Sequence, residues 1–326
     1  MTSSGWLPVR AYWQDHQACL DWCLFDKKSF TEPFFEQTVQ RLLQHPFHHV
    51  FRQQTGINAL ADARSKHSSI APTGFIFHMS RCGSTLLGQL LAGFPENIVL
   101  SEPPPLDFVL LAHYAEPATS QSQRIDWLRG MVNAFGQKRT GLETRLFVKF
   151  DAWHIHELPL IREAFPDVPW IFLYRNPIEV MVSHAKQPGS WMIPDIVQPS
   201  VLQVDKSDWI PGQQQDYCAK VLAKICQAGL LHSQQHDGLL LNYEELPNAF
   251  QTRLASPFNL SVDENTINKI GEISQFNAKT PGMSFKKDRE QKQLSATEKM
   301  RELTARHLEP IYRQLEAHRM EQMKRF

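Results

Sequence analysis

The 326-residue sequence lacks net charge, is poor in cysteine and has no long hydrophobic run. Thirty-four Lys and Arg residues balance thirty-four Asp and Glu residues, so no protein-wide attraction to nucleic acid or an anionic membrane is expected. Any anion site must therefore be a local cluster of cations. No stretch approaches about 18 apolar residues, and the N-terminus lacks an apolar signal segment, so we expect neither a membrane span nor secretion.

Cysteine is scarce, and an odd number of thiols leaves one unpaired in any disulfide framework. This favours a reducing compartment, and we expect a cytoplasmic protein. Neither the cysteines nor the fourteen histidines are spaced like the ligands of a familiar metal site, so we expect no metal. The five cysteines are Cys19, Cys23, Cys82, Cys218 and Cys226.

Two regions differ in the rhythm of their apolar residues. Residues 1–70 are rich in Gln, His and aromatic side chains, and apolar residues three and four apart over 34–51 predict helices. We expect a helical N-terminal extension here. Residues 71–326 are predicted to form one α/β domain, because short apolar runs alternate with longer helical patterns from Gly74 onward.

The second region contains five predicted strands, and a helical pattern follows each. This alternation predicts a doubly wound, parallel sheet of about five strands with helices on both faces. The Pro- and Gly-rich stretch 187–212 is expected to be a surface loop. The predicted strands are 74–79, 97–100, 145–150, 170–175 and 238–243.

In such sheets ligands bind beyond the carboxyl ends of the strands. Polar residues found there often serve as helix caps. Capping does not explain Arg81 or Arg175, because a cation is disfavoured at the positive N-terminus of a helix. A bound anion accounts for both arginines. The residues expected at this edge are Ser80 to Thr85, Ser101, Glu102, Asp151, Arg175 to Pro177, Tyr243 and Glu244.

The segment HMSRCGSTLL links the first of these strands to its helix. Gly83 permits close backbone approach, and the N–H groups from Cys82 to Thr85 point toward an anion at the helix start. The hydroxyls of Ser84 and Thr85 and the guanidinium of Arg81 add further donors. This turn is not a Walker A loop, because a cation precedes the glycine and no lysine follows it.

A second candidate anion site lies in YRNPIEVMVSH, after the fourth strand. Arg175 ends the strand, and Ser183 follows eight residues later on the next helix. Asn176 and Pro177 suit the cap and first turn of that helix. Arg175 paired with a nearby carboxylate is the alternative reading. Combined with the first turn, the motif indicates a ligand with two separated phosphate groups.

These segments resemble the sulfotransferases that use 3′-phosphoadenosine 5′-phosphosulfate as donor. The turn from Ser80 to Thr85 is similar to the family's first signature, with Arg81 in place of its lysine and Cys82 in place of its serine. Arg175, Asn176, Pro177 and Ser183 are similar to the second signature. LLLNYEEL (239–246) is similar to the segment after the family's last core strand. The resemblance covers about residues 73–290 and implies a P-loop-like fold.

The resemblance implies a role for each matched residue. Arg81, Gly83, Ser84 and Thr85 hold the 5′-phosphosulfate, while Arg175 and Ser183 hold the 3′-phosphate. Tyr243 lies near the adenine, but Leu86 stands where the family has a stacking aromatic residue. The basic segment of residues 279–292 closes over the 3′-phosphate or is an ordinary charged surface. Its cations are Lys279, Lys286, Lys287, Arg289 and Lys292.

Sulfuryl transfer to an alcohol requires a base for the hydroxyl proton and a cation beside the leaving phosphate. Arg81 suits the second role. Glu102, Asp151 and His154 compete for the first, because each follows a predicted strand or lies one turn beyond it. The alternatives are that Glu102 orients an arginine and that Asp151 caps a helix.

Two other function classes stay open. A P-loop kinase for a small molecule, using ATP and magnesium, fits the fold but lacks the expected lysine. A non-catalytic nucleotide-binding module fits the same donor residues. The acceptor cannot be read from the sequence, and a small molecule or a glycan bearing a hydroxyl or amine is expected.

Overall fold

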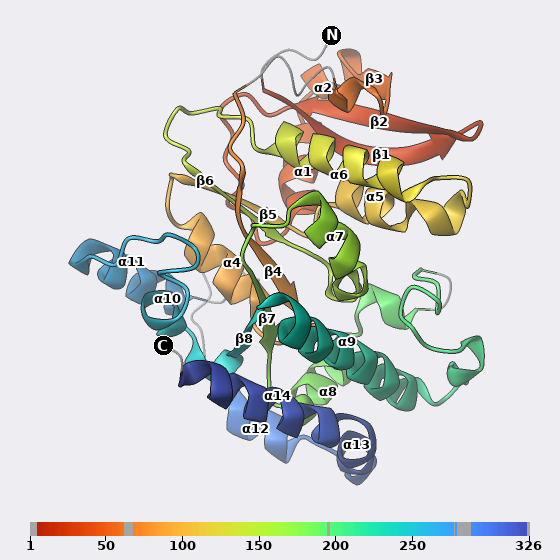
Figure 1. Ribbon diagram of the computed structural model, residues 1–326, viewed down its shortest axis with the longest axis vertical. Helices are drawn as coiled ribbons and strands as arrows, with labels where there is room; N and C mark the ends of the chain where they lie inside the picture. Colours follow the sequence, from red (N-terminus) through yellow and green to blue (C-terminus); the bar gives the residue numbers. More distant parts are fainter. Residues whose placement is uncertain (1–4, 62–67, 194–195, 277, 279–287, 325–326) are drawn as a thin grey trace. The chain divides into compact units, whose positions relative to one another are not determined.

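The computed structural model describes residues 5–61, 68–193, 196–276, 278 and 288–324. The chain is a mixed α/β protein with two separate sheets (Figure 1). One sheet holds β1 (Trp6–Gln14), β2 (Gln17–Leu24) and β3 (Gln53–Gly56). The other holds β4 (Pro72–His78), β5 (Asn97–Ser101), β6 (Arg145–Lys149), β7 (Trp170–Tyr174) and β8 (Leu239–Asn242).

The larger sheet has the strand order β5-β6-β4-β7-β8. Strand β5 pairs in parallel with β6, and β7 pairs in parallel with β8. The five predicted strands are therefore confirmed. The order reverses about β4, which is the doubly wound arrangement in which ligands bind beside the central strand's carboxyl end. Every residue of β7 and β8 is buried, which explains their continuous apolar character.

Helices alternate with these strands, as the sequence predicts. Helix α6 begins at a capping box, in which Ser120 and Gln123 satisfy each other's backbone N–H groups. Helix α8 begins at Asn176, whose side chain accepts from the N–H of Ile178. The α-helices of the sheet region are α4 (Ser84–Ala92), α5 (Pro104–Ala115), α6 (Gln121–Phe135), α7 (Leu158–Ala164), α8 (Pro177–Lys186) and α9 (Gln214–His236).

The remaining helices belong to the two ends of the chain. The N-terminal part carries α1 (Phe35–Leu43) and α2 (Phe47–Val50). After β8 come α10 (Ala249–Thr252), α11 (Glu264–Ser274), α12 (Arg289–Leu294), α13 (Glu298–Leu303) and α14 (Glu309–Met323). Within the segment 187–212, short 3₁₀ turns are found at Ser190–Met192 and Lys206–Asp208.

The helical prediction for residues 1–70 is wrong for residues 6–24 and 53–56. Strands β1 and β2 form an antiparallel hairpin through Asp15 and His16, both with positive φ, and β3 pairs with β2. Helices α5 and α6 pack on β1 (Figure 1). The helices predicted over 34–51 are present as α1 and α2. The buried side chains of α1, which are Phe35, Thr38 and Val39, follow the helical period.

The chain divides into two compact units. The first comprises Met1–Phe75, Gly88–Phe150 and Glu157–Pro169, and the second comprises Ile76–Leu87, Asp151–His156 and Trp170–Phe326. These units cut across the expected boundary at residue 70, which stays a prediction. None of the five cysteines, all of which the structure describes, forms a disulfide. Among the described residues, no helix combines the length and apolar character that crossing a bilayer demands.

Candidate functional site

The turn between β4 and α4 is held in an unusual backbone conformation. Ser80, Arg81 and Gly83 have φ values of 70°, 50° and 93°, in the left-handed region that non-glycine residues seldom adopt. The N–H of Ser80 donates to Nδ1 of His78 at 3.0 Å. Helix α4 begins directly afterwards, at Ser84. The first N–H groups of a helix have no partner within it, so this turn presents donors suited to an anion.

Two side chains of the turn bind to neighbouring segments of the protein, and two others lie at the start of α4. The Cys82 thiol is buried and donates to the carbonyl of Leu173 in β7 at 3.1 Å. Its expected contribution to an anion site is therefore confined to its backbone N–H. Arg81 donates from Nη2 to the carbonyl of Gln187 at 2.5 Å. Ser84 and Thr85 are both buried at the first turn of α4.

Tyr243 connects this turn to the second predicted motif. Its ring lies so close to Gly83 that a Cβ there would come within 2.3 Å of the ring atom Cδ2. The guanidinium carbon of Arg175 lies 4.1 Å from the centre of the same ring, within the range of a cation–π contact. Burial raises the pKa of Tyr243, so its phenol is neutral. The two motifs therefore both contact the ring of Tyr243.

Arg175 is buried and bound by two carboxylates. Its Nε donates to Glu179 at 2.6 Å, and its Nη2 donates to Asp288 at 2.9 Å. Burial alone lowers the pKa of Arg175, but the hydrogen bonds with Asp288 and Glu179 outweigh burial and raise it. The guanidinium is therefore permanently charged. The alternative that Arg175 pairs with a nearby carboxylate is thus confirmed, and its role at a 3′-phosphate stays a prediction.

Ser183 lies on α8, the helix that follows Arg175. Its hydroxyl donates to the carbonyl of Glu179, one turn earlier, at 2.8 Å. A serine in mid-helix commonly satisfies its proton this way. The oxygen's lone pairs are not consumed by that bond, so the hydroxyl keeps acceptor capacity, while donation to a ligand requires rotation of the side chain.

Glu102 belongs to the other unit, where it is paired with a lysine. It follows β5, has a φ of 55°, and its N–H donates to the carbonyl of Lys149 at 2.8 Å. The Lys149 ammonium donates to the Glu102 carboxylate. Lys149 is fully buried, whereas Glu102 keeps 22% of its side chain exposed. The carboxylate is thus held by a buried cation yet open to solvent.

Lys149 is the residue that the sequence analysis overlooked. It ends β6, and parallel pairing places it beside Ser101 at the end of β5. Its ammonium also lies 5.2 Å from the centre of the Phe34 ring. The absence of a side chain on Gly88 leaves room, since a Cβ there would lie 3.3 Å from the Ser101 hydroxyl. The sequence signal that could have identified Lys149 is a single lysine at the end of an otherwise apolar strand.

Asp151 and His154 lie together in the second unit, just after β6. The N–H of Asp151 donates to Nδ1 of His154 at 3.2 Å. This bond requires the ring proton of a neutral imidazole to sit on Nε2. His154 is buried, while Asp151 is partly exposed. Both candidate bases are therefore present, with one nitrogen of His154 already engaged.

The predicted basic segment is only partly described. Lys279, Lys286 and Lys287 lie outside the described residues. Arg289 pairs with Glu244 at 2.5 Å, and Lys292 pairs with Asp288 at 2.8 Å.

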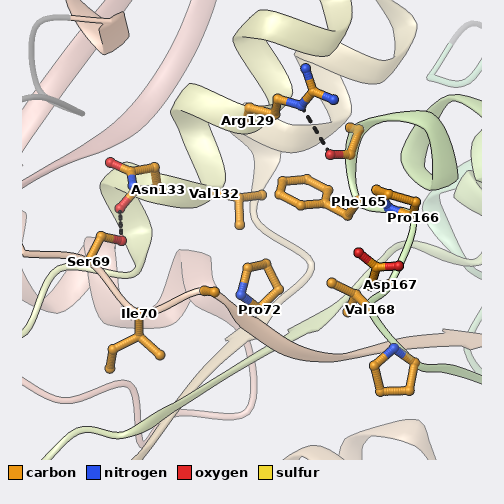
Figure 2. A pocket seen from close by; sticks show the side chains of 13 residues that line it. Ser69, Ile70, Pro72, Arg129, Val132, Asn133, Phe165, Pro166, Asp167 and Val168 are labelled. Atoms are coloured by element: carbon orange, nitrogen blue, oxygen red, sulfur yellow. Dashed lines mark hydrogen bonds between the residues drawn. The ribbon is translucent and has the colours of Figure 1, made fainter.

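A cavity of about 530 Å³ lies in the first unit, apart from every predicted site residue. It is lined by Ser69 to Pro72, three residues of α6 and the segment 164–169 (Figure 2). Arg129 points across it but donates to the carbonyls of Glu163 and Ala164 at 3.1 and 3.0 Å. That arginine therefore satisfies the end of α7, which gives it a structural role.

No protein-family model matches the sequence, and no curated protein matches it. Solved structures with similarity to the chain include the sulfotransferase domain from the curacin biosynthetic pathway, at 16% identity and a TM-score of 0.44, covering 73% of this chain and 98% of that domain. The sulfotransferase domain of the Synechococcus PCC 7002 olefin synthase is 17% identical with a TM-score of 0.42, covering 78% and 96%.

Mouse sulfotransferase SULT7A1, solved in complex with PAP, is 13% identical with a TM-score of 0.41, covering 80% of this chain and 94% of its own. Each of these proteins is a sulfotransferase, the class that the sequence motifs resemble. At these identities and scores the similarity alone assigns no activity to this chain.

Proposed function

We propose that this protein transfers the sulfuryl group of 3′-phosphoadenosine 5′-phosphosulfate to a hydroxyl or amine acceptor. The observation that carries the proposal is the position of Tyr243, whose ring contacts Gly83 and Arg175 together. Both motifs that resemble donor-binding signatures therefore lie against one side chain within one unit. A ligand with two separated anionic groups suits such an arrangement.

In this proposal the turn before α4 binds the 5′-phosphosulfate. The left-handed residues Ser80, Arg81 and Gly83 direct the chain into the helix, and the N–H groups from Cys82 to Thr85 face the anion. Arg175 binds the 3′-phosphate as a planar fork of donors, with Ser183 as a second contact. Tyr243, between the two groups, lies near the nucleoside.

The transfer step requires a proton acceptor and a cation. A base removes the acceptor's proton as the new sulfur–oxygen bond forms, and the bond from sulfur to the 5′-phosphate oxygen breaks. Arg81 neutralises the charge that develops on that leaving oxygen. Glu102 is the base we favour, because Lys149 holds one of its oxygens while 22% of the Glu102 side chain stays exposed. Asp151 and His154 are the alternatives.

A kinase is less well supported by the same residues. The turn has Arg81 before its glycine and Leu86 after Gly-Ser-Thr, whereas phosphoryl transfer in P-loop enzymes depends on a lysine after the glycine and on magnesium.

The test is a turnover assay with the donor supplied and a panel of alcohols, phenols, sugars and amines. We expect the mass of one acceptor class to increase by one SO₃ group while adenosine 3′,5′-bisphosphate accumulates in equal amount, without added magnesium. Glu102→Gln should lower turnover by roughly 10²–10⁴-fold while leaving donor affinity intact. Donor binding without transfer to any acceptor would instead favour a non-catalytic module.

Asp151→Asn and His154→Gln are the matched variants, since each alters one competing base. If either variant abolishes turnover while Glu102→Gln does not, the base is reassigned to that residue.

A further inference from the structure

Among the described residues, the charges paired with Arg175 and with its partners balance one another. Arg289 lies beside Glu179 at 3.6 Å and pairs with Glu244, and Lys292 pairs with Asp288. Three cations and three carboxylates thus face one another. A phosphate carrying nearly two negative charges gains little from entering a network that is already balanced, so one carboxylate must leave when it binds.

The two carboxylates on Arg175 differ in how firmly they are held. Glu179 lies one turn along α8 from Arg175, and only 2% of its side chain is exposed. Asp288 approaches from a segment more than a hundred residues away, and 38% of its side chain is exposed. Asp288 is therefore the carboxylate that can move from Arg175 into solvent without disrupting the core.

The Asp288 carboxylate also has alternative hydrogen-bond partners, which are the backbone N–H groups at the start of α12. It stands at the N-cap position of α12, where aspartate usually accepts from the N–H two or three residues on. Its side chain makes no such bond, and is used instead on Arg175 and Lys292. If it leaves Arg175, the carboxylate is available to cap α12, whose N-cap makes no side-chain hydrogen bond.

Lys292 supports the same interpretation. Its side chain is only 12% exposed, and its ammonium lies 2.8 Å from the second oxygen of Asp288. Burial lowers its pKa, and the hydrogen bond with Asp288 counteracts burial. Any group that displaces Asp288 must therefore accept hydrogen bonds from both Lys292 and Arg175, and a phosphate has enough oxygens to do so.

We propose that Asp288 acts as an internal anion that occupies the 3′-phosphate position on Arg175 and Lys292, and that the donor binds by displacing it. This inference rests on the proposed function. It makes Asp288 a determinant of donor affinity that opposes binding, in contrast to the basic residues around it.

The test measures the dissociation constants of adenosine 3′,5′-bisphosphate and adenosine 5′-monophosphate by titration calorimetry. Asp288→Asn removes the competing charge, so we expect it to bind the bisphosphate roughly tenfold more tightly, because like charges at one site oppose each other. Its affinity for the monophosphate, which lacks the 3′-phosphate, should not change. Asp288→Glu keeps a carboxylate and should bind the bisphosphate as the unaltered protein does.

Glu290→Gln is the matched control, because it removes the same charge from an exposed residue two positions away. An unchanged or weaker bisphosphate affinity in Asp288→Asn, with normal thermal unfolding, overturns the inference while leaving the proposed function standing. Equal binding of the two nucleotides by the unaltered protein overturns the 3′-phosphate site itself, and the inference falls with it.

Discussion

Gly83 and Tyr243 show how strictly single residues shape the candidate site. The glycine needs its positive φ for the turn and its missing side chain for the ring of Tyr243. The guanidinium carbon of Arg175 lies 4.1 Å from the centre of the same ring. A change at Gly83 therefore reaches the second anion-binding motif through one aromatic side chain.

Gly83→Ala should destabilise the protein and weaken donor binding together. An alanine at this φ is strained by roughly 1–3 kcal/mol, and its methyl group would lie 2.3 Å from the Tyr243 ring. Chemical unfolding and bisphosphate titration measure both effects. Gly212→Ala is the control, because Gly212 has a φ of 83° with nothing within 4 Å. Equal losses in both variants would argue against the ring contact.

Arg175→Lys should weaken binding of adenosine 3′,5′-bisphosphate by roughly 10–100-fold, because an ammonium keeps the charge but loses the planar pair of donors. Adenosine 5′-monophosphate should bind as before. Competition titration distinguishes the two ligands. Arg313→Lys, on an exposed arginine of α14, controls for the substitution itself. A parallel loss for both nucleotides would place Arg175 away from the 3′-phosphate.

The residues of the donor motifs were predictable from the sequence. A glycine, a proline or a cation directly after a strand seldom serves packing or helix capping alone, so its presence there indicates a binding site. The contacts of Lys149 and Asp288 were not predictable, for a physical reason. Lys149 is buried in β6, and only tertiary packing places Glu102 beside it. Asp288 meets Arg175 across more than a hundred residues of chain, a distance at which spacing carries no information.

At the scale of elements, α14 holds the ends of the strands that carry Arg175 and Tyr243. Glu316 accepts from the Tyr174 hydroxyl at 2.5 Å and from Asn242 at 2.8 Å. Tyr174 ends β7 and Asn242 ends β8, while Arg319 on α14 donates to the second oxygen of Glu316. Helix α14 lies beside α9 and β8 (Figure 1). One carboxylate thus ties a helix to two adjacent strands.

Glu316→Gln should lower the free energy of unfolding by about 1–3 kcal/mol at neutral pH, since charged hydrogen bonds become neutral ones. Burial raises the pKa of Glu316, but hydrogen bonds from Arg319, Tyr174 and Asn242 outweigh it and lower the pKa. The stabilisation is therefore present above the carboxyl's ordinary pKa and is lost as pH falls through the lowered value.

Urea unfolding of both proteins from neutral to acid pH checks this. The difference between them should shrink below about pH 4.5, the ordinary pKa of the group. A difference that is constant with pH would mean that Glu316 acts through packing alone.

The core strands were predictable, since each is a short apolar run between turns or helices. Strands β1 and β2 were missed because their burial does not alternate regularly. Four of the nine residues of β1 are partly buried, Pro8 interrupts it, and the register shifts between Pro8 and Arg10. The Asp15-His16 turn between aromatic runs was the usable signal, because two-residue hairpins require positive φ.

For the whole molecule, donor binding should appear as thermal stabilisation that is independent of magnesium. Adenosine 3′,5′-bisphosphate at a hundred times its dissociation constant should add about 2.7 kcal/mol to the unfolding free energy. A thermal shift assay with and without EDTA measures this. Stabilisation by ATP with magnesium, and none by the bisphosphate, would contradict the proposed sulfotransferase function and favour a kinase.

The turn after β4 has a thermodynamic consequence of its own. Ser80, Arg81 and Gly83 occupy left-handed conformations, and the turn is held by its hydrogen bonds to His78, Gln187 and Leu173. The ordering entropy of the turn is therefore lost during folding and not during association. The anion cradle is therefore preorganised. Its calorimetric signature should be a favourable enthalpy with a small entropic penalty, and the ordering that accompanies binding should be confined to the movement of Asp288.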